Sequence, residues 1–256
     1  MEEVIEKAIG RVIDFMHENL GEHFTIDDMA RTAMYSKFHF SRAFQRATGI
    51  SPGRFLSAIR LQEAKRLLLC TSLSVTDISH RVGYTSVGTF SSRFRTSVGV
   101  APTTYRELRG FAPEIPMARR SSEGTTVVQG EIVAPPGRPP GLIFIGLFPD
   151  RLPHGSPVRC TVLHRPGRFI LNAVPAGTWH VLAHSVPPGR ESTLGARPVA
   201  SDQALAVAAC GPITVRPDVP VKHADLTLRP ISALDPPVLL ALLDVRLVAL
   251  QVDAAS

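Results

Sequence analysis

The sequence has few cysteines and no long apolar segment. Its three cysteines, Cys70, Cys160 and Cys210, are odd in number and lie far apart without metal-ligand spacing, which argues against a disulfide framework or a cysteine metal centre. We interpret them as reduced, mostly buried thiols. The first residues are acidic where a secretion signal would be basic, and no apolar run approaches the length of a membrane span. These absences predict a cytoplasmic protein with no membrane partner.

Proline is scarce in the first part of the chain and aromatic residues are scarce in the rest. Only two of the 22 prolines, Pro52 and Pro102, precede residue 113, whereas 12 of the 16 aromatic residues do. The segment that follows is polar, contains two prolines, two serines and a glycine, and has no periodicity. We therefore predict one domain over residues 1–112, a linker over residues 113–125 and a second domain over residues 126–256.

Carboxylates are missing from two long stretches of the first domain. Residues 29–62 include six cationic side chains and no carboxylate, and residues 78–106 include four and none, in a chain of net charge +6. Cations that neutralise phosphates release condensed counterions, so uncompensated positive charge favours a polyanion partner. A solvated basic face would have the same composition, so charge alone does not decide.

An internal repeat sets the architecture of the first domain. Residues 24–55 match residues 73–105, first at an offset of 49 and then at an offset of 50, with one residue added near Tyr84. The matching residues are Thr25, Ile26, Asp28, Met29, Ser36, Phe40, Ser41, Phe44, Gly49, Pro52 and Phe55 in the first copy, and Ser74, Val75, Asp77, Ile78, Ser86, Phe90, Ser91, Phe94, Gly99, Pro102 and Tyr105 in the second.

Each copy has the end signals of two short helices. A hydroxyl residue followed by aspartate predicts a capping box for the first helix, and a serine and a glycine are suited to begin and end the second. Two short helices joined by a tight turn form a helix-turn-helix. Further helices are expected over residues 2–20, over residues 52–70 and after Pro102, where proline suits a first helical turn. The first domain is therefore predicted to be all-α.

The second helix of each copy has an apolar face and a polar face. In the first copy Phe40, Ala43, Phe44 and Ala47 follow helical spacing and should face the core. The opposite stripe is Phe38, Ser41, Arg42 and Gln45, and its counterpart is Gly88, Ser91, Ser92 and Arg95 with Thr89 at the edge. Arginine, glutamine and an aromatic ring suit contacts with base edges in the major groove. The alternative is a polar solvent face with one stray phenylalanine.

These stripes give two sets of predicted DNA contacts and no predicted catalytic residue, metal or cofactor. Base contacts are expected from Phe38, Ser41, Arg42, Gln45, Gly88, Thr89, Ser91 and Ser92. Contacts with phosphates or groove edges are expected from Lys37, His39, Arg46, Arg54, Arg93 and Arg95. Because the second stripe has mostly small side chains, the first copy should discriminate sequences and the second should mainly position the protein.

Residues 4–108 resemble the DNA-binding domain of the AraC family. The resemblance rests on Tyr35-Ser36-Lys37-Phe38-His39-Phe40-Ser41-Arg42-Ala43-Phe44 and Gly49-Ile50-Ser51-Pro52, then on Val82-Gly83-Tyr84, Thr89-Phe90-Ser91-Ser92-Arg93-Phe94 and Gly99-Val100-Ala101-Pro102 through Tyr105-Arg106. It implies seven helices, with two recognition helices in successive major-groove segments, and base contacts at Phe38, Ser41, Arg42, Gly88, Thr89, Ser91 and Ser92.

The chain departs from the family pattern in two respects. Many members have arginine at the position of Ser92, whereas here Arg93 follows one place later, on the expected inner face of the helix. The additional domain also follows the DNA-binding domain, whereas family members with a sensing domain commonly have it first. The first departure weakens base recognition by the second copy, and the second removes the usual clue to an effector.

The second domain has the pattern of an all-β sandwich, because short apolar runs alternate with proline and glycine turns. Strands are expected over residues 126–133, 142–148, 157–163, 169–173, 178–186, 204–209 and 223–228. Residues 167–179 look like the central hairpin of transthyretin-like or carboxypeptidase regulatory-like domains. Residues 237–252 suit a buried strand pair or a terminal helix.

Chemistry-bearing residues do not converge in the second domain. His154, His164, His180 and His184 suggest a metal or acid–base site, but no carboxylate accompanies them between Asp150 and Glu191, so ordinary surface or satisfied histidines are the favoured interpretation. Trp179 is expected in the core rather than in a ligand platform.

Together these features predict a sequence-specific, DNA-binding transcription regulator with a C-terminal sensing or association domain. Its expected partners are double-stranded DNA, RNA polymerase, a small-molecule effector at the C-terminal domain and a second copy of the chain. One alternative is an enzyme, for example a DNA-repair or carbohydrate-acting one, that the helical domain delivers to DNA. A repair alkyltransferase needs an activated thiolate, and the setting of the three cysteines does not provide one. A third class, an architectural binder, would discriminate little between sequences.

Overall fold

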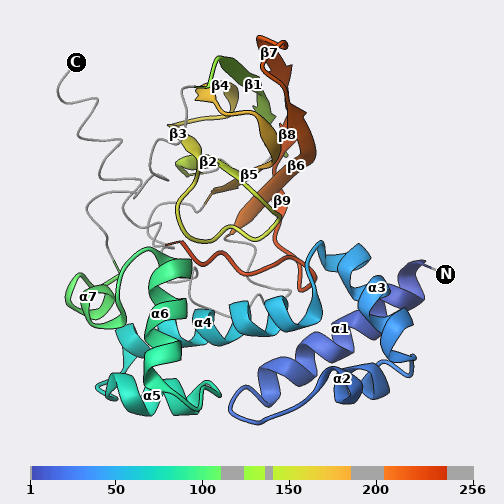
Figure 1. Cartoon of the computed structure of the whole chain (residues 1–256), viewed down its shortest axis with the longest axis vertical. Coiled ribbons are helices and arrows are strands. Elements are labelled where there is room, and N and C mark those ends of the chain that lie inside the picture. The colour runs from blue at the N-terminus through green and yellow to red at the C-terminus, as the bar shows by residue number, and fades with distance from the viewer. Residues whose placement is uncertain (1, 111–123, 136–140, 186–204, 241–256) are drawn as a thin grey trace. The chain divides into compact units, whose positions relative to one another are not determined.

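The computed structural model describes residues 2–110, 124–135, 141–185 and 205–240, and its contacts divide the chain into two compact units (Figure 1). The helical unit comprises the described residues 2–110 and 232–239. The sheet unit comprises residues 124–135, 141–185 and 205–231, with Leu240. Among the described residues, no helix combines the length and apolar character needed to cross a membrane.

The helical unit has seven helices within its described residues, which confirms the predicted all-α class. They are α1 (Glu2–Glu18), α2 (Ile26–Thr32), α3 (Lys37–Thr48), α4 (Pro52–Cys70), α5 (Val75–Arg81), α6 (Val87–Val98) and α7 (Pro102–Glu107). The two copies of the repeat have matching cores. The ring centroids of Phe40 and Phe44, and those of Phe44 and Phe55, are 5.5 and 5.4 Å apart. The equivalent pairs, Phe90 with Phe94 and Phe94 with Tyr105, are 5.7 and 5.6 Å apart.

Helix α4 joins the two copies of the repeat (Figure 1). It begins at Pro52, where proline costs no helical hydrogen bond, and it runs for 19 residues. Most of its residues are buried, among them Leu56, Ile59 and Leu67, and they lie on several sides of the helix. Helix α4 therefore lacks a single narrow apolar stripe. The first copy packs near the start of α4 and the second copy near its end.

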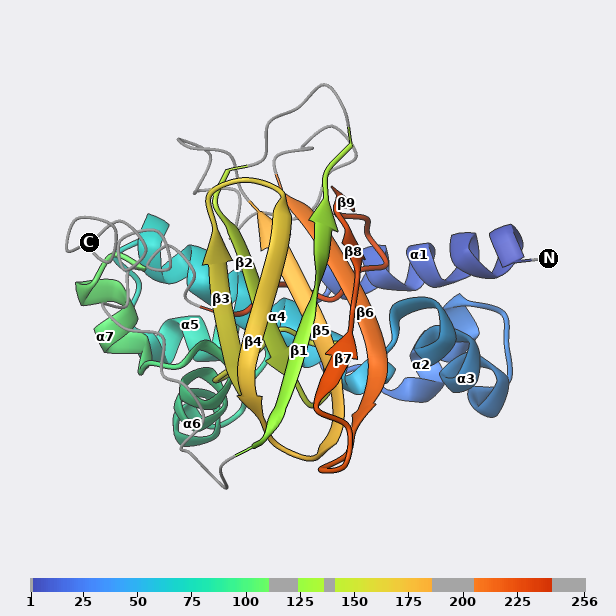
Figure 2. The ribbon, with the colours of Figure 1, turned by 90° about the horizontal axis from the view of Figure 1, so that it is seen from above.

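The sheet unit is a sandwich of two sheets (Figure 2), as predicted. One sheet has the order β4-β1-β7, with β8 also paired to β1, and the other has the order β3-β2-β5-β6-β9. The strands are β1 (Thr126–Val133), β2 (Ile143–Phe148), β3 (Arg159–Leu163), β4 (Gly167–Val174), β5 (Gly177–Ser185), β6 (Ala206–Val215), β7 (Val221–His223), β8 (Leu226–Thr227) and β9 (Arg229–Pro230). Val128 and Phe169 from one sheet pack against Ile145 and Val181 from the other in one core.

Two sequence predictions for the sheet unit need correction. The predicted hairpin over residues 167–179 is wrong, because β4 pairs with β1 in one sheet while β5 pairs with β2 and β6 in the other. The chain changes sheets at a turn where Ala173 has a positive φ of 54° and Gly177 one of 150°. Strand β6 also continues to Val215, beyond the predicted end at residue 209.

The segment 232–239 groups with the helices rather than with the sheets. Within it and at Leu240 the backbone is neither helical nor extended in a sheet, so residues 237–240 differ from the predicted strand pair or helix. Residues 241–252 of that prediction, and residues 113–123 of the predicted linker, lie outside the described residues. The domain limits set out above remain a prediction.

Candidate nucleic-acid interface

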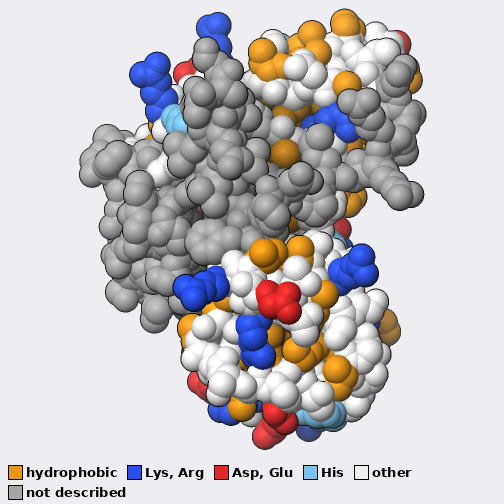
Figure 3. All heavy atoms as spheres, turned by 90° about the vertical axis from the view of Figure 1, so that its left-hand side faces the viewer, with side chains coloured by type: hydrophobic (Ala, Val, Ile, Leu, Met, Phe, Trp, Pro, Cys, Tyr) orange, Lys and Arg blue, Asp and Glu red, His pale blue; other side chains and the backbone are white. Residues whose placement is uncertain are grey.

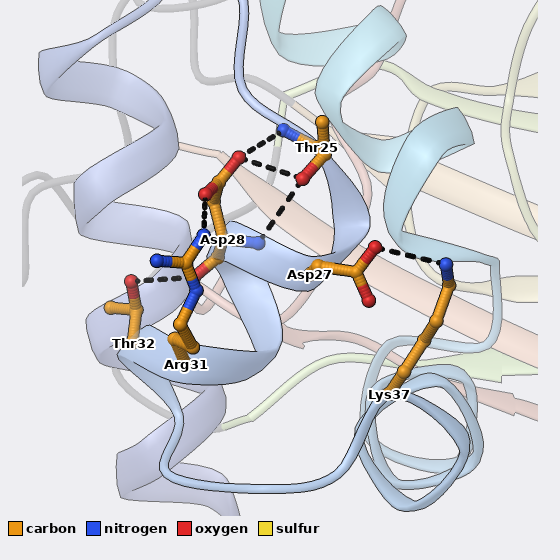
Figure 4. Close-up of polar contacts among 6 residues, drawn as sticks. All are labelled: Thr25, Asp27, Asp28, Arg31, Thr32 and Lys37. Carbon is orange, nitrogen blue, oxygen red and sulfur yellow. Dashed lines mark hydrogen bonds and ion pairs between the residues drawn. The ribbon is translucent and has the colours of Figure 1, made fainter.

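The first helix-turn-helix begins at a capping box (Figure 4). The Thr25 side chain accepts a hydrogen bond from the Asp28 backbone N–H at 3.3 Å, and the Asp28 carboxylate accepts from the Thr25 backbone N–H at 2.7 Å. The bonds that the Asp28 carboxylate accepts from the Thr25 backbone N–H and hydroxyl lower the pKa of Asp28, with a smaller contribution from Arg31 beside it. Ser74 and Asp77 repeat the box at α5, so the predicted caps of both first helices are confirmed.

The turn between the two helices is also repeated. Met34 and Gly83 both have a positive φ, of 58° and 84°, and each donates its N–H to the carbonyl three residues earlier. Tyr35 and Tyr84 then donate to the carbonyls of Ala30 and Ser79, both at 2.9 Å. The backbone is thus equivalent up to the tyrosine, which places the added residue of the second copy directly after Tyr84.

Helix α3 presents the predicted first stripe to the outside. Phe40, Ala43 and Phe44 are buried, while the Phe38 side chain is 81% exposed. Lys37, His39, Arg42, Gln45 and Arg46 are exposed as well, and so is Arg54 at the start of α4. The half-buried Ser41 hydroxyl donates to the Lys37 carbonyl at 2.8 Å, which leaves its oxygen lone pairs as acceptors. An aromatic ring, two guanidinium groups and an amide therefore share one accessible surface.

Helix α6 presents the second stripe with smaller side chains. Gly88, Thr89, Ser92 and Arg95 are exposed and Ser91 is half-buried. A Cβ placed on Gly88 would meet only the Ser86 Oγ, at 3.7 Å, so a partner surface can approach the helix closely here. Arg93 is exposed too, so its predicted inner position is wrong. The core at this level is filled by Phe90 and Phe94, and the long Arg93 side chain extends past them into solvent.

Several cations of the two carboxylate-free stretches have structural partners. Lys37 Nζ lies 3.0 Å from the Asp27 carboxylate, in an exposed pair between α3 and α2 (Figure 4). Arg60 donates to the carbonyls of Leu20 and Glu22, and Arg106 donates to the carbonyls of Leu68 and Leu73. The uncompensated charge is therefore smaller than the composition indicates, and it is concentrated on α3, α6 and their flanks. Figure 3 shows Lys and Arg side chains spread over the end of the helical unit that holds α5–α7.

A junction between the two copies was not predicted from the sequence. Arg60 on α4 donates a hydrogen bond to the Leu20 carbonyl in the loop after α1. Gly83 in the α5–α6 turn packs closely against Arg60, so that a Cβ on Gly83 would lie 2.6 Å from Arg60 Nη2. The Ser57 hydroxyl and the Tyr84 hydroxyl lie 3.4 Å apart beside it. The only signal in the sequence is that glycine replaces Met34 at the equivalent turn position. This junction fixes α4 to both copies.

The histidines and thiols of the sheet unit do not form a second site of obvious chemistry. Among the described residues no group of three His, Cys, Asp or Glu side chains could hold a metal ion. The ring of His184 is 5% exposed and stacks on Phe144 at 4.9 Å, while burial and nearby Arg151 lower the pKa of His180. Trp179 packs against the core and donates its indole N–H to the Pro175 carbonyl at 2.9 Å, in agreement with its expected place.

All three cysteines are free, but the prediction of mostly buried thiols is wrong. Cys70 is exposed at the end of α4, whereas Cys160 on the edge strand β3 and Cys210 on β6 are half-buried. Burial raises the pKa of the Cys160 thiol to about 11 and also raises that of Cys210. Both thiols are therefore protonated at neutral pH and are poor nucleophiles.

Known proteins resemble the part of the chain that holds the two repeats. Residues 29–108 match the family described as a helix-turn-helix domain. The lactose operon transcription activator of Staphylococcus xylosus is 31% identical over 104 residues, 41% of this chain and 37% of that protein. The HTH-type transcriptional activator AarP of Providencia stuartii is 31% identical over 98 residues, 38% of this chain and 73% of AarP.

Solved structures resemble it as well. One is the DNA-binding domain of AdpA in complex with a target DNA, with 31% identity over 39% of this chain and 89% of that one, and a TM-score of 0.38. The matched region thus covers most of AarP and most of the AdpA DNA-binding domain, but less than two fifths of the Staphylococcus xylosus activator.

Proposed function

Because the chain belongs to the AraC family of helix-turn-helix transcription regulators, we propose that it regulates transcription by placing α3 and α6 in successive major-groove segments of one duplex. The observation that supports this most directly is the accessible face of α3, where Phe38, Arg42 and Gln45 stand outside a fully packed core. These three side chains match the hydrogen-bonding and methyl groups that base pairs present in the major groove.

The spacing of the two copies supports binding by a single chain. The 19 residues of α4 correspond to about 28 Å of helix, close to the roughly 34 to 36 Å of one duplex turn. The junction at Arg60 and Gly83 restrains both copies against α4, so they should bind as one rigid body. Footprinting should then show two protected major-groove segments about one turn apart on the same face. Protection of one segment by the intact chain would contradict this arrangement.

Arg42 and Arg46 give a matched test of base and phosphate contact on one helix. Arg42 lies on the stripe one turn beyond Phe38, whereas the exposed Arg46 lies in the last turn of α3, and we assign it to the phosphates. Arg42→Ala should cost about 1–3 kcal/mol on the preferred duplex and relax specificity at one base pair. Arg46→Ala should weaken binding to all sequences alike and lower the salt slope by about one unit. Equal losses on preferred and random DNA for Arg42→Ala would refute its role.

The second helix-turn-helix should contribute mainly positioning. Gly88, Ser91 and Ser92 have short side chains, and Arg93 and Arg95 are the long exposed cations of α6. An arginine flexible enough to reach a phosphate holds the duplex without selecting a base. Alanine at Arg93 and Arg95 should therefore reduce affinity for preferred and random DNA in equal proportion. Lost discrimination at specific base pairs in the distal segment would show that α6 selects sequence too.

The sheet unit is assigned to regulation or association, through a small-molecule effector, RNA polymerase or a second copy of the chain, and not to catalysis. The raised pKa values of Cys160 and Cys210 oppose thiol chemistry. Arg165, between β3 and β4, and Arg168, at the start of β4, are exposed cations that give a test of DNA contact by this unit. If the unit stays off DNA, replacing both with alanine should leave the salt slope unchanged. A decrease of about two units would show that the sheet unit contacts phosphates.

A further inference from the structure

Lys65 is a buried amino group of the helical unit. It lies on α4, its side chain is 3% exposed, and its Nζ is 5.9 Å from the centre of the Tyr105 ring of α7. Burial lowers the pKa of Lys65 to about 7. An amino group inside a core is costly unless hydrogen-bond acceptors surround it. Two of its acceptors come from a part of the chain more than 170 residues away.

These acceptors belong to the segment 232–239, which we call the strap. Lys65 Nζ donates to the backbone carbonyls of Val238 at 3.4 Å and Leu239 at 3.0 Å. The Val238 and Leu239 side chains are themselves buried, and Pro236 and Pro237 stiffen the backbone that leads to them. In Figure 1 the strap runs along α4. The helical unit therefore completes its own core with residues that follow the sheet unit in the sequence.

The strap is joined to the sheet unit by a short stretch of chain. It follows β9 directly, and the Ile231 N–H donates to the Leu205 carbonyl at 3.0 Å inside the sheet unit. A turn closed by the Asp235 carboxylate on Ser232 comes next. Six residues separate Ile231 from Val238, the first residue bonded to Lys65. The edge strand β9 is therefore joined to the residues that contact α4 by a short stretch of chain that includes two prolines.

We propose that the strap is a positioning element for DNA binding, which holds α4 and α7 through Lys65 and transmits the state of the sheet unit to the two recognition helices. The inference rests on the proposed function. While the strap is seated, the carbonyls of Val238 and Leu239 solvate Lys65 and α4 keeps both copies at the spacing of one duplex turn. When a ligand or partner at the sheet edge draws the strap away, Lys65 gains water, the α4–α7 packing loosens and DNA affinity falls.

The test uses the intact chain with one disrupting variant and one control in the strap. Leu239→Asp places a charge at a side chain that is 1% exposed and should unseat the strap, whereas Ala233→Asp adds the same charge at an exposed position. Affinity is measured by anisotropy on a duplex selected from a random pool by the wild-type chain. Leu239→Asp should lower affinity at least tenfold, and Ala233→Asp should stay within twofold. Equal affinity for the two variants overturns the proposal.

Hydrogen exchange on the wild-type chain supplies a second measurement, in case Leu239→Asp does not fold. If seating of the strap favours DNA binding, DNA binding must favour seating of the strap by the same factor. Binding of the selected duplex should therefore slow hydrogen exchange of the strap amides and of the α4 amides near Lys65. Unchanged exchange in the strap on DNA binding overturns the proposal. A wild-type chain that enriches no sequence from the pool refutes the proposed function instead. In that case hydrogen exchange still tests whether the strap holds α4, because the α4 amides should exchange faster in the Leu239→Asp variant than in the Ala233→Asp variant.

Discussion

Replacing Gly83 with alanine tests whether the junction between the two copies stabilises the helical unit. Gly83 has a φ of 84°, in the left-handed region, and it faces the α1–α2 loop and α4. A Cβ there would lie 2.6 Å from Arg60 Nη2 and closer still to the Leu20 carbonyl oxygen. Neither neighbour is free to move, since Arg60 is bonded to that same carbonyl at 3.0 Å.

The expected magnitude has two parts. A left-handed conformation costs an L-residue roughly 1–2 kcal/mol. Displacing Arg60 would weaken its hydrogen bonds to Leu20 and Glu22, each with a net value of about 0.5–1.5 kcal/mol. Gly83→Ala should therefore lower the free energy of unfolding of the helical unit by about 2–4 kcal/mol.

Met34 is the matched control, because it occupies the same turn position in the first copy. Its φ is 58°, but its side chain is 80% exposed and supports little packing. Met34→Gly removes the left-handed strain, and the added freedom of the unfolded chain offsets part of the gain. We expect it to stabilise the unit by up to about 1 kcal/mol, the opposite sign to Gly83→Ala.

Urea unfolding with two probes measures both effects. Far-ultraviolet circular dichroism follows the helices, and fluorescence of Trp179, the only tryptophan, follows the sheet unit. Gly83→Ala should shift the first transition to lower urea and leave the second in place. A change below about 0.5 kcal/mol for Gly83→Ala would refute the close packing of the junction. A destabilised Met34→Gly would refute the account of its strain.

Four further predictions concern the pH dependence of the two units, the α6 face and the first cap. The pKa of Lys65 is about 7 in the folded unit and about 10.4 in an unfolded chain, so the folded unit binds fewer protons between these values and should gain stability as pH rises from about 7 to 10. Circular dichroism at each pH checks this, and Lys65→Met should abolish the rise. The pKa of Cys160 has an effect of opposite sign, because its raised folded value of about 11 makes the sheet unit lose stability as pH rises from about 9 to 11, and Trp179 fluorescence should show a smaller loss in Cys160→Ala. Gly88→Ala should stabilise the helical unit by about 0.5–1 kcal/mol, since the Cβ would make only an ordinary contact with the Ser86 Oγ, and weaker binding to preferred DNA would show that the duplex approaches α6 at this residue. Thr25→Ala should destabilise the unit by about 0.5–2 kcal/mol in thermal unfolding, and no change would mean that the capping box contributes nothing.

The fold of the helical unit follows from signals that act over a few residues. Thr25 and Asp28 close a capping box because both lie within one turn, and Gly99 ends α6 in the left-handed conformation wherever the rest of the chain lies. Pro52 begins α4 for a similar local reason. Equivalent caps occur in both copies of the repeat, so each helix end in one copy supports its counterpart in the other. For this reason the ends of the helices could be predicted almost to the residue.

The outward face of α3 was also predictable from the sequence, because a helix with one apolar stripe must turn the other side to solvent. Phe38 is exposed for this reason although its side chain is apolar. Arg93 shows the limit of the rule, since spacing alone assigned it to the inner face. A long side chain at the border of the apolar stripe can extend past its neighbours to water, and only the packing of Phe90 and Phe94 decides that.

Contacts between distant residues could only be found in the tertiary structure. Arg60 adds to the positive charge of the sequence, but its partners, the carbonyls of Leu20 and Glu22, are identified only in the tertiary structure. Strands β4 and β5 are neighbours in sequence and suit a hairpin, but their partners β1, β2 and β6 assign them to different sheets. The contact between Lys65 and the strap joins residues that are especially far apart in the sequence. Its acceptors are backbone carbonyls, which every residue has, so no residue type in the sequence indicates the contact. The sequence by itself determined the two helix-turn-helix units and their outer faces, since caps and periodicity are local, whereas packing across long loops decided what joins them.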